Sequence, residues 1–168
     1  MKTLVERRYI SQNEFVDFGN IAQVPAEEFF GAALWQLFKG IDSPYKSVLK
    51  LLLMEIYASQ YPNIDLLCQR FKREIYNGET SLDRLDPYIM LYQDIEEYLE
   101  QAAETDRLDF VRRCFYFKVN ERLSTPDHPR YVSWRRELIR SLATAWGWGG
   151  VYLEMLDARP TWKINRVL

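Results

Sequence analysis

Two lysines stand one helical turn apart in a stretch that is otherwise typical of a buried helix. Lys46 and Lys50 lie within PYKSVLKLLLMEIY, where apolar residues leave little room for a side that faces water. Ser43 precedes Lys46 by three residues, and residues three or four apart share one side of a helix. A buried ammonium group without a partner is very costly, so this side must meet water, a carboxylate or a bound anion.

Phosphate binding is the chemistry that such a row could perform. The Ser43 hydroxyl stands at a helix start, where free backbone N–H groups favour anions, and the two amines add positive charge. A nucleoside triphosphate would suit this set. In the alternative, the lysine stems pack along the apolar surface and their amines pair with Asp42, Glu55 or other glutamates. Spacing alone favours this structural alternative.

The chain contains no motif for a chemical step. It has no P-loop, no nucleophile elbow and no HExxH sequence. Cys68, Cys114 and His128 are too few and too scattered to indicate a disulfide framework or a Cys/His metal site. We therefore expect neither a catalytic residue nor a metal ligand in this chain.

The elements that position the lysines are predicted to be helices. Capping residues at Ser43, Asn63, Asp86, Thr105 and Ser133 mark helix starts, and Pro44 and Pro87 occupy first helical positions. The predicted helices cover residues 25–40, 43–61, 63–78, 86–104, 105–123, 133–147, 150–158 and 160–168. Residues 25–168 thus form an all-α domain, a single array of roughly seven or eight helices. Residues 1–24 are expected to form an irregular or short-strand arm, or the end of a preceding lobe.

Apolar faces predict how these helices pack. Phe30, Leu34, Leu37 and Phe38 form the apolar stripe of the first helix, which we expect to face the core. Trp134, Trp146, Trp148 and Trp162 gather in the last third of the chain. They indicate core packing or an exposed patch that docks another domain.

Charge is divided along the chain. Residues 63–104 hold ten acidic and four basic residues, whereas residues 105–140 hold nine basic and five acidic ones. Pairing between helices is the favoured interpretation, and a basic face that docks a domain or lines an anion cleft is the alternative. The net charge of -2 disfavours a nucleic-acid binder. Without a leader sequence or a long apolar run, we expect no membrane insertion and a cytoplasmic location.

Longer stretches of the sequence resemble a known family. FFGAALWQLFKGIDSPYKSVLKLLLMEIYASQYP, RLDFVRRCFYFKVNERLS, SWRREL, AWGW and WKI occur in this order. At these distances they resemble the bacterial class I adenylate cyclases of enterobacterial type, which make cyclic AMP and pyrophosphate from ATP. The resemblance implies a longer parent protein whose N-terminal lobe looks like a nucleotidyltransferase, with a Gly-Ser motif and an Asp-x-Asp pair that holds Mg²⁺. Neither motif occurs here, so the Mg²⁺ ligands and the catalytic centre are expected outside this chain.

The resemblance also implies a role for the helical segment. It would follow the catalytic lobe, be truncated at its C-terminus, and help to place ATP without being active alone. Ser43, Tyr45, Lys46 and Lys50 become the candidate phosphate contacts, and Arg112 and Arg113 rank second. The expected partners are ATP, together with the missing lobe, and other domains of the parent. The alternative function is a non-catalytic helical scaffold or regulatory interaction module.

Overall fold

The computed structural model describes residues 6–8, 26–127 and 133–158, and within them it contains seven helices and no strand. The all-α prediction is therefore confirmed. The helices are α2 (Ala26–Asp42), α3 (Pro44–Gln60), α4 (Leu67–Tyr76), α5 (Pro87–Gln101), α6 (Thr105–Val119), α7 (Trp134–Ala145) and α8 (Gly150–Ala158). The predictions for most of the N-terminal arm, for His128, for Trp162 and for the helix at 160–168 lie outside the described residues.

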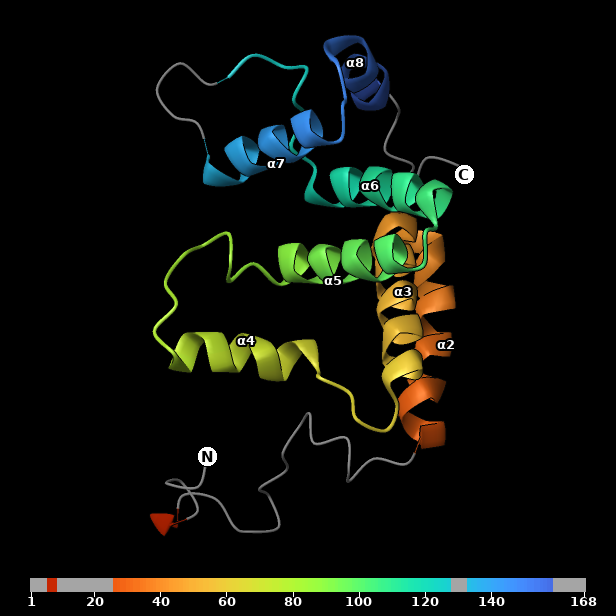
Figure 1. Ribbon diagram of the computed structural model, residues 1–168, viewed down its shortest axis with the longest axis vertical. Coiled ribbons are helices and arrows are strands. Elements are labelled where there is room, and N and C mark those ends of the chain that lie inside the picture. Colours follow the sequence, from red (N-terminus) through yellow and green to blue (C-terminus); the bar gives the residue numbers. More distant parts are fainter. Residues whose placement is uncertain (1–5, 9–25, 128–132, 159–168) are drawn as a thin grey trace.

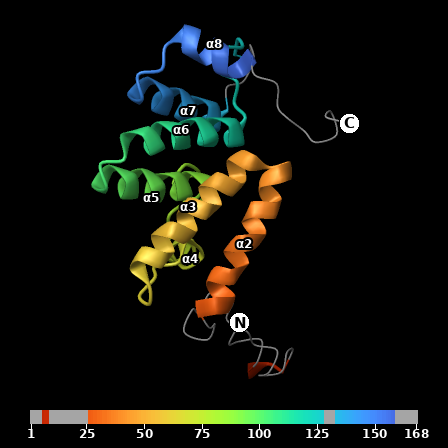
Figure 2. The same cartoon turned by 90° about the vertical axis from the view of Figure 1, so that its right-hand side faces the viewer.

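Helices α2 and α3 form an antiparallel hairpin, and the remaining helices stack beside it. The hairpin stands upright in Figure 1, where α4, α5 and α6 follow one another upward in chain order and α7 and α8 lie above its upper end. Helices α5 and α6 run antiparallel to each other and cross α3 at a steep angle (Figure 1). Helices α7 and α8 lie beyond α6, on the side away from α5 (Figures 1 and 2).

The core lies where α3 crosses α5 and α6. Its most deeply buried side chains come from five helices: Leu49, Tyr92, Ile95, Leu99, Val111, Cys114, Phe115, Ile139 and Leu156. The opposite side of α3 packs on α2. There Ser47 is only 3% exposed, and a methyl group added at Gly40 would lie 3.8 Å from the Ser47 Cβ. Small residues at this contact allow the two helices to approach closely, so α3 is enclosed from two sides.

Three of the predicted helix starts are confirmed. Ser43 is the N-cap of α3 with Pro44 next to it. The Asp86 carboxylate caps α5 by accepting a hydrogen bond from the Tyr88 N–H at 2.8 Å. The Ser133 hydroxyl caps α7 by accepting one from the Arg136 N–H at 3.1 Å. The Asp86 and Ser133 side chains each satisfy a backbone donor that the first turn of a helix leaves free, whereas the Ser43 side chain makes no such hydrogen bond.

Two predicted caps are wrong. Helix α4 begins at Leu67 and not directly after Asn63. The segment between α3 and α4 is non-helical because Ile64 and Leu66 within it are buried in the core. The Tyr57 hydroxyl accepts a hydrogen bond from the Leu67 N–H at 2.8 Å, as a distant substitute for a local cap. Helix α6 begins at Thr105 itself, so its N-cap is one residue earlier than predicted.

The apolar stripe of α2 faces outward, contrary to the sequence prediction. Leu34, Leu37 and Phe38 are all exposed, and only Phe30 of the predicted stripe packs against the core. The half-buried positions of α2 include Ala33, Gln36 and Gly40, which are spaced as one side of a helix. The contact between α2 and α3 therefore uses small side chains, and the large apolar ones remain uncovered.

Trp134, Trp146 and Trp148 are half-buried and pack against the core. The Trp146 ring centroid lies 5.5 Å from that of Tyr92 and 4.7 Å from that of Trp148. Trp148 continues the contact to Tyr116 at 5.7 Å. Edge-to-face pairs of this kind add stability beyond the area they bury. The aromatic cluster holds the turn between α7 and α8 against α5 and α6, so core packing is confirmed for Trp146 and Trp148 and the alternative of an exposed patch is wrong there.

Pairing between the acidic and basic segments is confirmed. Arg112 on α6 lies 3.1 Å from the Glu96 carboxylate on α5, and Arg135 on α7 lies 2.8 Å from Asp86. Exposed pairs of this kind contribute little stability, but partly buried ones fix the relative positions of helices.

Phe115 provides a direct test of the core. It is fully buried, and its ring stacks on Tyr92 at 4.5 Å. Phe115→Ala should lower the free energy of unfolding by roughly 3–5 kcal/mol, since it leaves a cavity at the helix crossing. Phe110 on the same helix is 49% exposed, so Phe110→Ala should cost no more than about 1 kcal/mol. Chemical denaturation measures both values, and equal losses would contradict this core.

Glu55 links α3 to α6 in a manner that depends on pH. Its carboxylate accepts hydrogen bonds from Arg107 at 2.6 and 3.1 Å and from the Tyr98 hydroxyl at 3.1 Å. The Arg107 hydrogen bond holds the pKa of Glu55 below its usual 4.5, although burial opposes the shift. Ionised Glu55 therefore stabilises the fold above that pH, and the contribution is lost as the pH falls through the lowered pKa.

We expect the stability lost in Glu55→Gln to be greatest at neutral pH and to shrink below pH 4.5. Tyr98→Phe removes one of the donors, so it should cause a smaller loss with the same direction of pH dependence. Urea titrations across this range measure both variants. A loss that stays constant with pH would contradict the proposed role of the Glu55 charge.

Candidate functional site

The candidate site begins where α2 passes directly into α3. The Ser43 N–H donates to the Lys39 carbonyl at 2.9 Å, and the Ser43 carbonyl accepts from the Ser47 N–H at 3.0 Å. The Ser43 side chain is exposed and makes no capping hydrogen bond. Its hydroxyl is therefore free to bind a ligand, while its backbone joins the two helices.

Lys46 and Lys50 lie at the edges of an otherwise enclosed helix. Both are half-buried, because they flank the side of α3 on which Leu49, Leu53 and Tyr57 are buried. Within the part of the chain that the structure describes, no carboxylate lies within 4.0 Å of either amine. Glu55, one of the partners considered from the sequence, pairs with Arg107. Pairing of these lysines with Asp42 or Glu55, which the sequence left open, is therefore wrong.

Tyr45 packs within the fold. It is half-buried, and its ring centroid lies 4.8 Å from that of Phe117 on α6. The ring thereby helps to fix the start of α3 against α6. Its predicted contact with phosphate stays a prediction.

The two second-rank arginines have partners inside the helical array. Arg112 donates to Glu96 at 3.1 Å and lies over the Trp146 ring at 5.8 Å. Burial lowers the pKa of Arg112, but hydrogen bonds to Tyr92 and Glu96 outweigh this effect and keep the pKa above its ordinary value. Arg113 pairs with Asp109 at 2.9 Å. Both arginines are thus already neutralised, unlike the lysines, and their predicted contact with an anion stays a prediction.

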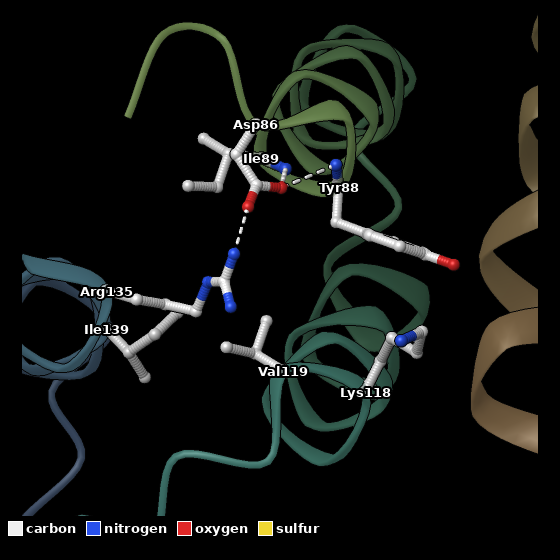
Figure 3. Close-up of a pocket in the computed structure, with 7 residues that line it drawn as sticks. All are labelled: Asp86, Tyr88, Ile89, Lys118, Val119, Arg135 and Ile139. Carbon is white, nitrogen blue, oxygen red and sulfur yellow. Dashed lines mark hydrogen bonds and ion pairs between the residues drawn. The ribbon is translucent and has the colours of Figure 1, made fainter. Parts of the chain in front are cut away.

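A cavity of about 190 Å³ lies between α5, α6 and α7 (Figure 3). Asp86 and Arg135 face each other across it, and the Lys118 amine lies 4.2 Å from the centre of the Tyr88 ring (Figure 3). Sequence reasoning missed Lys118 and Arg135 as cavity residues, although both fall in the basic segment and Arg135 meets the Asp86 cap. The volume is below the range typical of sites for drug-sized ligands, so a nucleotide would not fit inside it.

A second cavity, of about 240 Å³, lies between α3, α4 and α5. Its charged lining residues are three carboxylates, Asp65, Asp94 and Glu97, and one cation, Arg70. Arg70 holds the Asp94 carboxylate at 2.6 and 2.7 Å, while burial raises the pKa of Asp94. This excess of carboxylates repels a triphosphate, so the cavity does not serve as a phosphate site.

Metal ligation finds no support in the ranges 26–127 and 133–158. No group of three or more His, Cys, Asp or Glu side chains there could hold a metal ion. Carboxylates such as Asp94 and Asp127 are engaged by arginines instead. The described residues thus do not fit a Mg²⁺ site. None of the described helices is long and apolar enough to span a bilayer.

The chain matches known proteins over nearly its whole length. Residues 24–168 match the family described as adenylate cyclase, class-I, second domain. Adenylate cyclases of Salmonella typhimurium (strain LT2) and Escherichia coli (strain K12) are each 47% identical over 165 residues, which is 98% of this chain. The adenylate cyclase of Haemophilus influenzae is 46% identical over 167 residues. No solved structure matches the chain significantly.

These relatives are much longer than the chain, which spans 19% of their length. The matched part is the region that the family description calls the second domain. The chain therefore belongs to the class I adenylate cyclase family, as part of its second domain.

Proposed function

We propose that this chain is a helical lobe of an adenylate cyclase that converts ATP into cyclic AMP and pyrophosphate, and that it helps to hold the triphosphate. The observation that carries the proposal is the pair Lys46 and Lys50, two half-buried cations without a carboxylate among the described residues. Removing an ammonium group from water without a counter-charge is unfavourable. A polyanion in front of α3 would supply that charge.

The surroundings of the lysines support a phosphate in particular. The Ser43 hydroxyl is exposed and unbonded at the start of α3, and the N-terminus of a helix favours negative groups. Described arginines such as Arg107 and Arg112 are held by glutamates. The start of α3 is thus a place where positive charge remains available.

The cyclisation reaction indicates what role the two lysine amines would have. The 3′-hydroxyl oxygen of ATP attacks the α-phosphorus, and the bond from that phosphorus to the oxygen bridging to the β-phosphate breaks. Negative charge grows on the departing pyrophosphate. Ammonium groups fixed beside it stabilise this charge more strongly in the transition state than in the bound substrate, which accelerates the reaction.

We place the reacting centre outside this chain. The family resemblance implies a preceding nucleotidyltransferase-like lobe that binds Mg²⁺ and ATP, and when bound the metal would supply charge neutralisation there. Because the described residues do not fit such a site, no step in this chain depends on the metal. Use of ATP also favours a cytoplasmic location.

A scaffold or regulatory interaction module is the second candidate function. It is favoured by the uncovered apolar residues of α2, which indicate contact with another part of the parent protein. In that case Lys46 and Lys50 would be solvated surface charges without a kinetic role. The lysine variants below distinguish the two functions.

In a full-length class I cyclase carrying this segment, Lys46→Gln and Lys50→Gln should each lower kcat/KM for ATP by about 10- to 100-fold, since each removes a charged hydrogen bond of about 1.5–3 kcal/mol. Lys72→Gln, at an exposed position of α4, is the matched control and should leave the kinetics unchanged. Steady-state assays and melting temperatures separate catalysis from folding. Wild-type kinetics in both α3 variants would remove the phosphate role.

The isolated 168-residue chain should bind ATP weakly and form no cyclic AMP with ATP and Mg²⁺. Calorimetry measures the binding, and mass spectrometry of the nucleotides measures the product. The double change Lys46→Gln and Lys50→Gln should abolish the weak binding, since it removes both candidate phosphate-binding cations. Cyclic AMP above the level of a protein-free sample would contradict a reacting centre outside the chain.

A further inference from the structure

Helix α2 exposes a continuous row of large apolar side chains. Leu34 is 63% exposed, Trp35 59%, Leu37 57%, Phe38 67% and Ile41 64%. Leu34, Leu37, Phe38 and Ile41 follow the i, i+3, i+4, i+7 spacing that defines one face of a helix. We call these five residues the α2 row. Other described helices also expose apolar side chains, but none carries so long a row.

The row is not needed for the packing of α2 on α3. That contact uses the opposite, smaller side chains, with Gly40 near Ser47. An amphipathic helix normally turns its apolar face inward, and a large uncovered apolar face marks a protein interface. The row therefore indicates a second body on the far side of α2 from α3.

The chemistry of the row selects an apolar protein surface as its occupant. Leucine, isoleucine, phenylalanine and tryptophan dominate it, and Lys39 over the Trp35 ring at 5.3 Å is the cation that accompanies them. A nucleic acid or an anionic membrane would require more positive charge. An apolar surface on a folded domain buries such a row most favourably.

The position of the row in the parent protein indicates which domain covers it. The family description places a first domain before this second one, and the relatives extend far beyond the matched 19% of their length. The α2 row ends at Ile41, two residues before Ser43, where α2 passes into α3. A domain seated on the row would therefore lie close to the turn at which α3 begins.

We propose that the α2 row is the docking surface for the first domain of the same adenylate cyclase polypeptide. Burial of the row fixes that domain against α2 and brings its bound nucleotide to the start of α3. The two features that α2 and α3 leave unsatisfied, an apolar face and a pair of cations, are then covered by one body. This inference rests on the proposed place of the segment in a longer cyclase, but not on the kinetic role of the lysines.

Photo-cross-linking in the full-length cyclase tests the proposal. The photoreactive analogue p-benzoylphenylalanine replaces Phe38, whose 67% exposure leaves room for the added benzoyl group. After irradiation, digestion and mass spectrometry should identify cross-linked peptides from the region that precedes this segment in the same chain. Tyr76 on α4 is 87% exposed, and the same analogue placed there is the matched control, which should not give these peptides.

Several results would overturn the docking surface. The proposal would be contradicted if position 38 gave no cross-link, cross-linked to later regions of the polypeptide, or cross-linked to a second copy to form a covalent dimer. It would also be contradicted if position 76 gave the same peptides as position 38. The kinetics of the Lys46 and Lys50 variants test the phosphate role independently of the cross-linking. A cross-link to the first domain with wild-type kinetics in the lysine variants would retain the docking surface and remove only the phosphate role.

Discussion

Helix α3 is packed from two sides at once, and the rest of the molecule depends on this constraint. One side meets α5 and α6 through Leu49, Leu52 and Ile56, and the other meets α2 through Ser47. Only narrow edges of the helix remain for charged side chains. Lys46 and Lys50 occupy such an edge, where both side chains are half-buried.

The remaining helices make that arrangement rigid. Tyr92, Phe115 and Trp146 join α5, α6 and the end of α7 through ring contacts. Tyr116 donates to Asp157 of α8 at 2.8 Å, and Asp157 accepts from the Ser124 N–H at 2.9 Å. By contrast, the five side chains of the α2 row are each more than half exposed. The helices on one side of α3 are therefore tightly packed, whereas α2 on the other side leaves an apolar face uncovered.

Local signals in the sequence predicted most of the fold. Caps followed by proline or by an apolar pattern correctly located the starts of α3 and α5, since capping depends on neighbouring residues alone. The start of α4 was predicted wrongly because burial of Ile64 and Leu66 and a bond from distant Tyr57 decide it. Such long-range contacts leave no mark in a local pattern.

The candidate site was predictable in part. The spacing of Ser43, Lys46 and Lys50 placed them together, but spacing alone favoured pairing with a carboxylate such as Glu55, which the structure shows bound to Arg107. The outward direction of Leu34 and Phe38 was also hidden, because periodicity shows that a helix has an apolar face without showing what covers it.

A structure of a full-length class I cyclase with a non-hydrolysable ATP analogue is the most direct test of the central claim. The account predicts that the amines of Lys46 and Lys50 lie about 3 Å from phosphate oxygens, the distance of a charged hydrogen bond. Amines that point into solvent away from the nucleotide, or that pair with carboxylates of another domain, would contradict it.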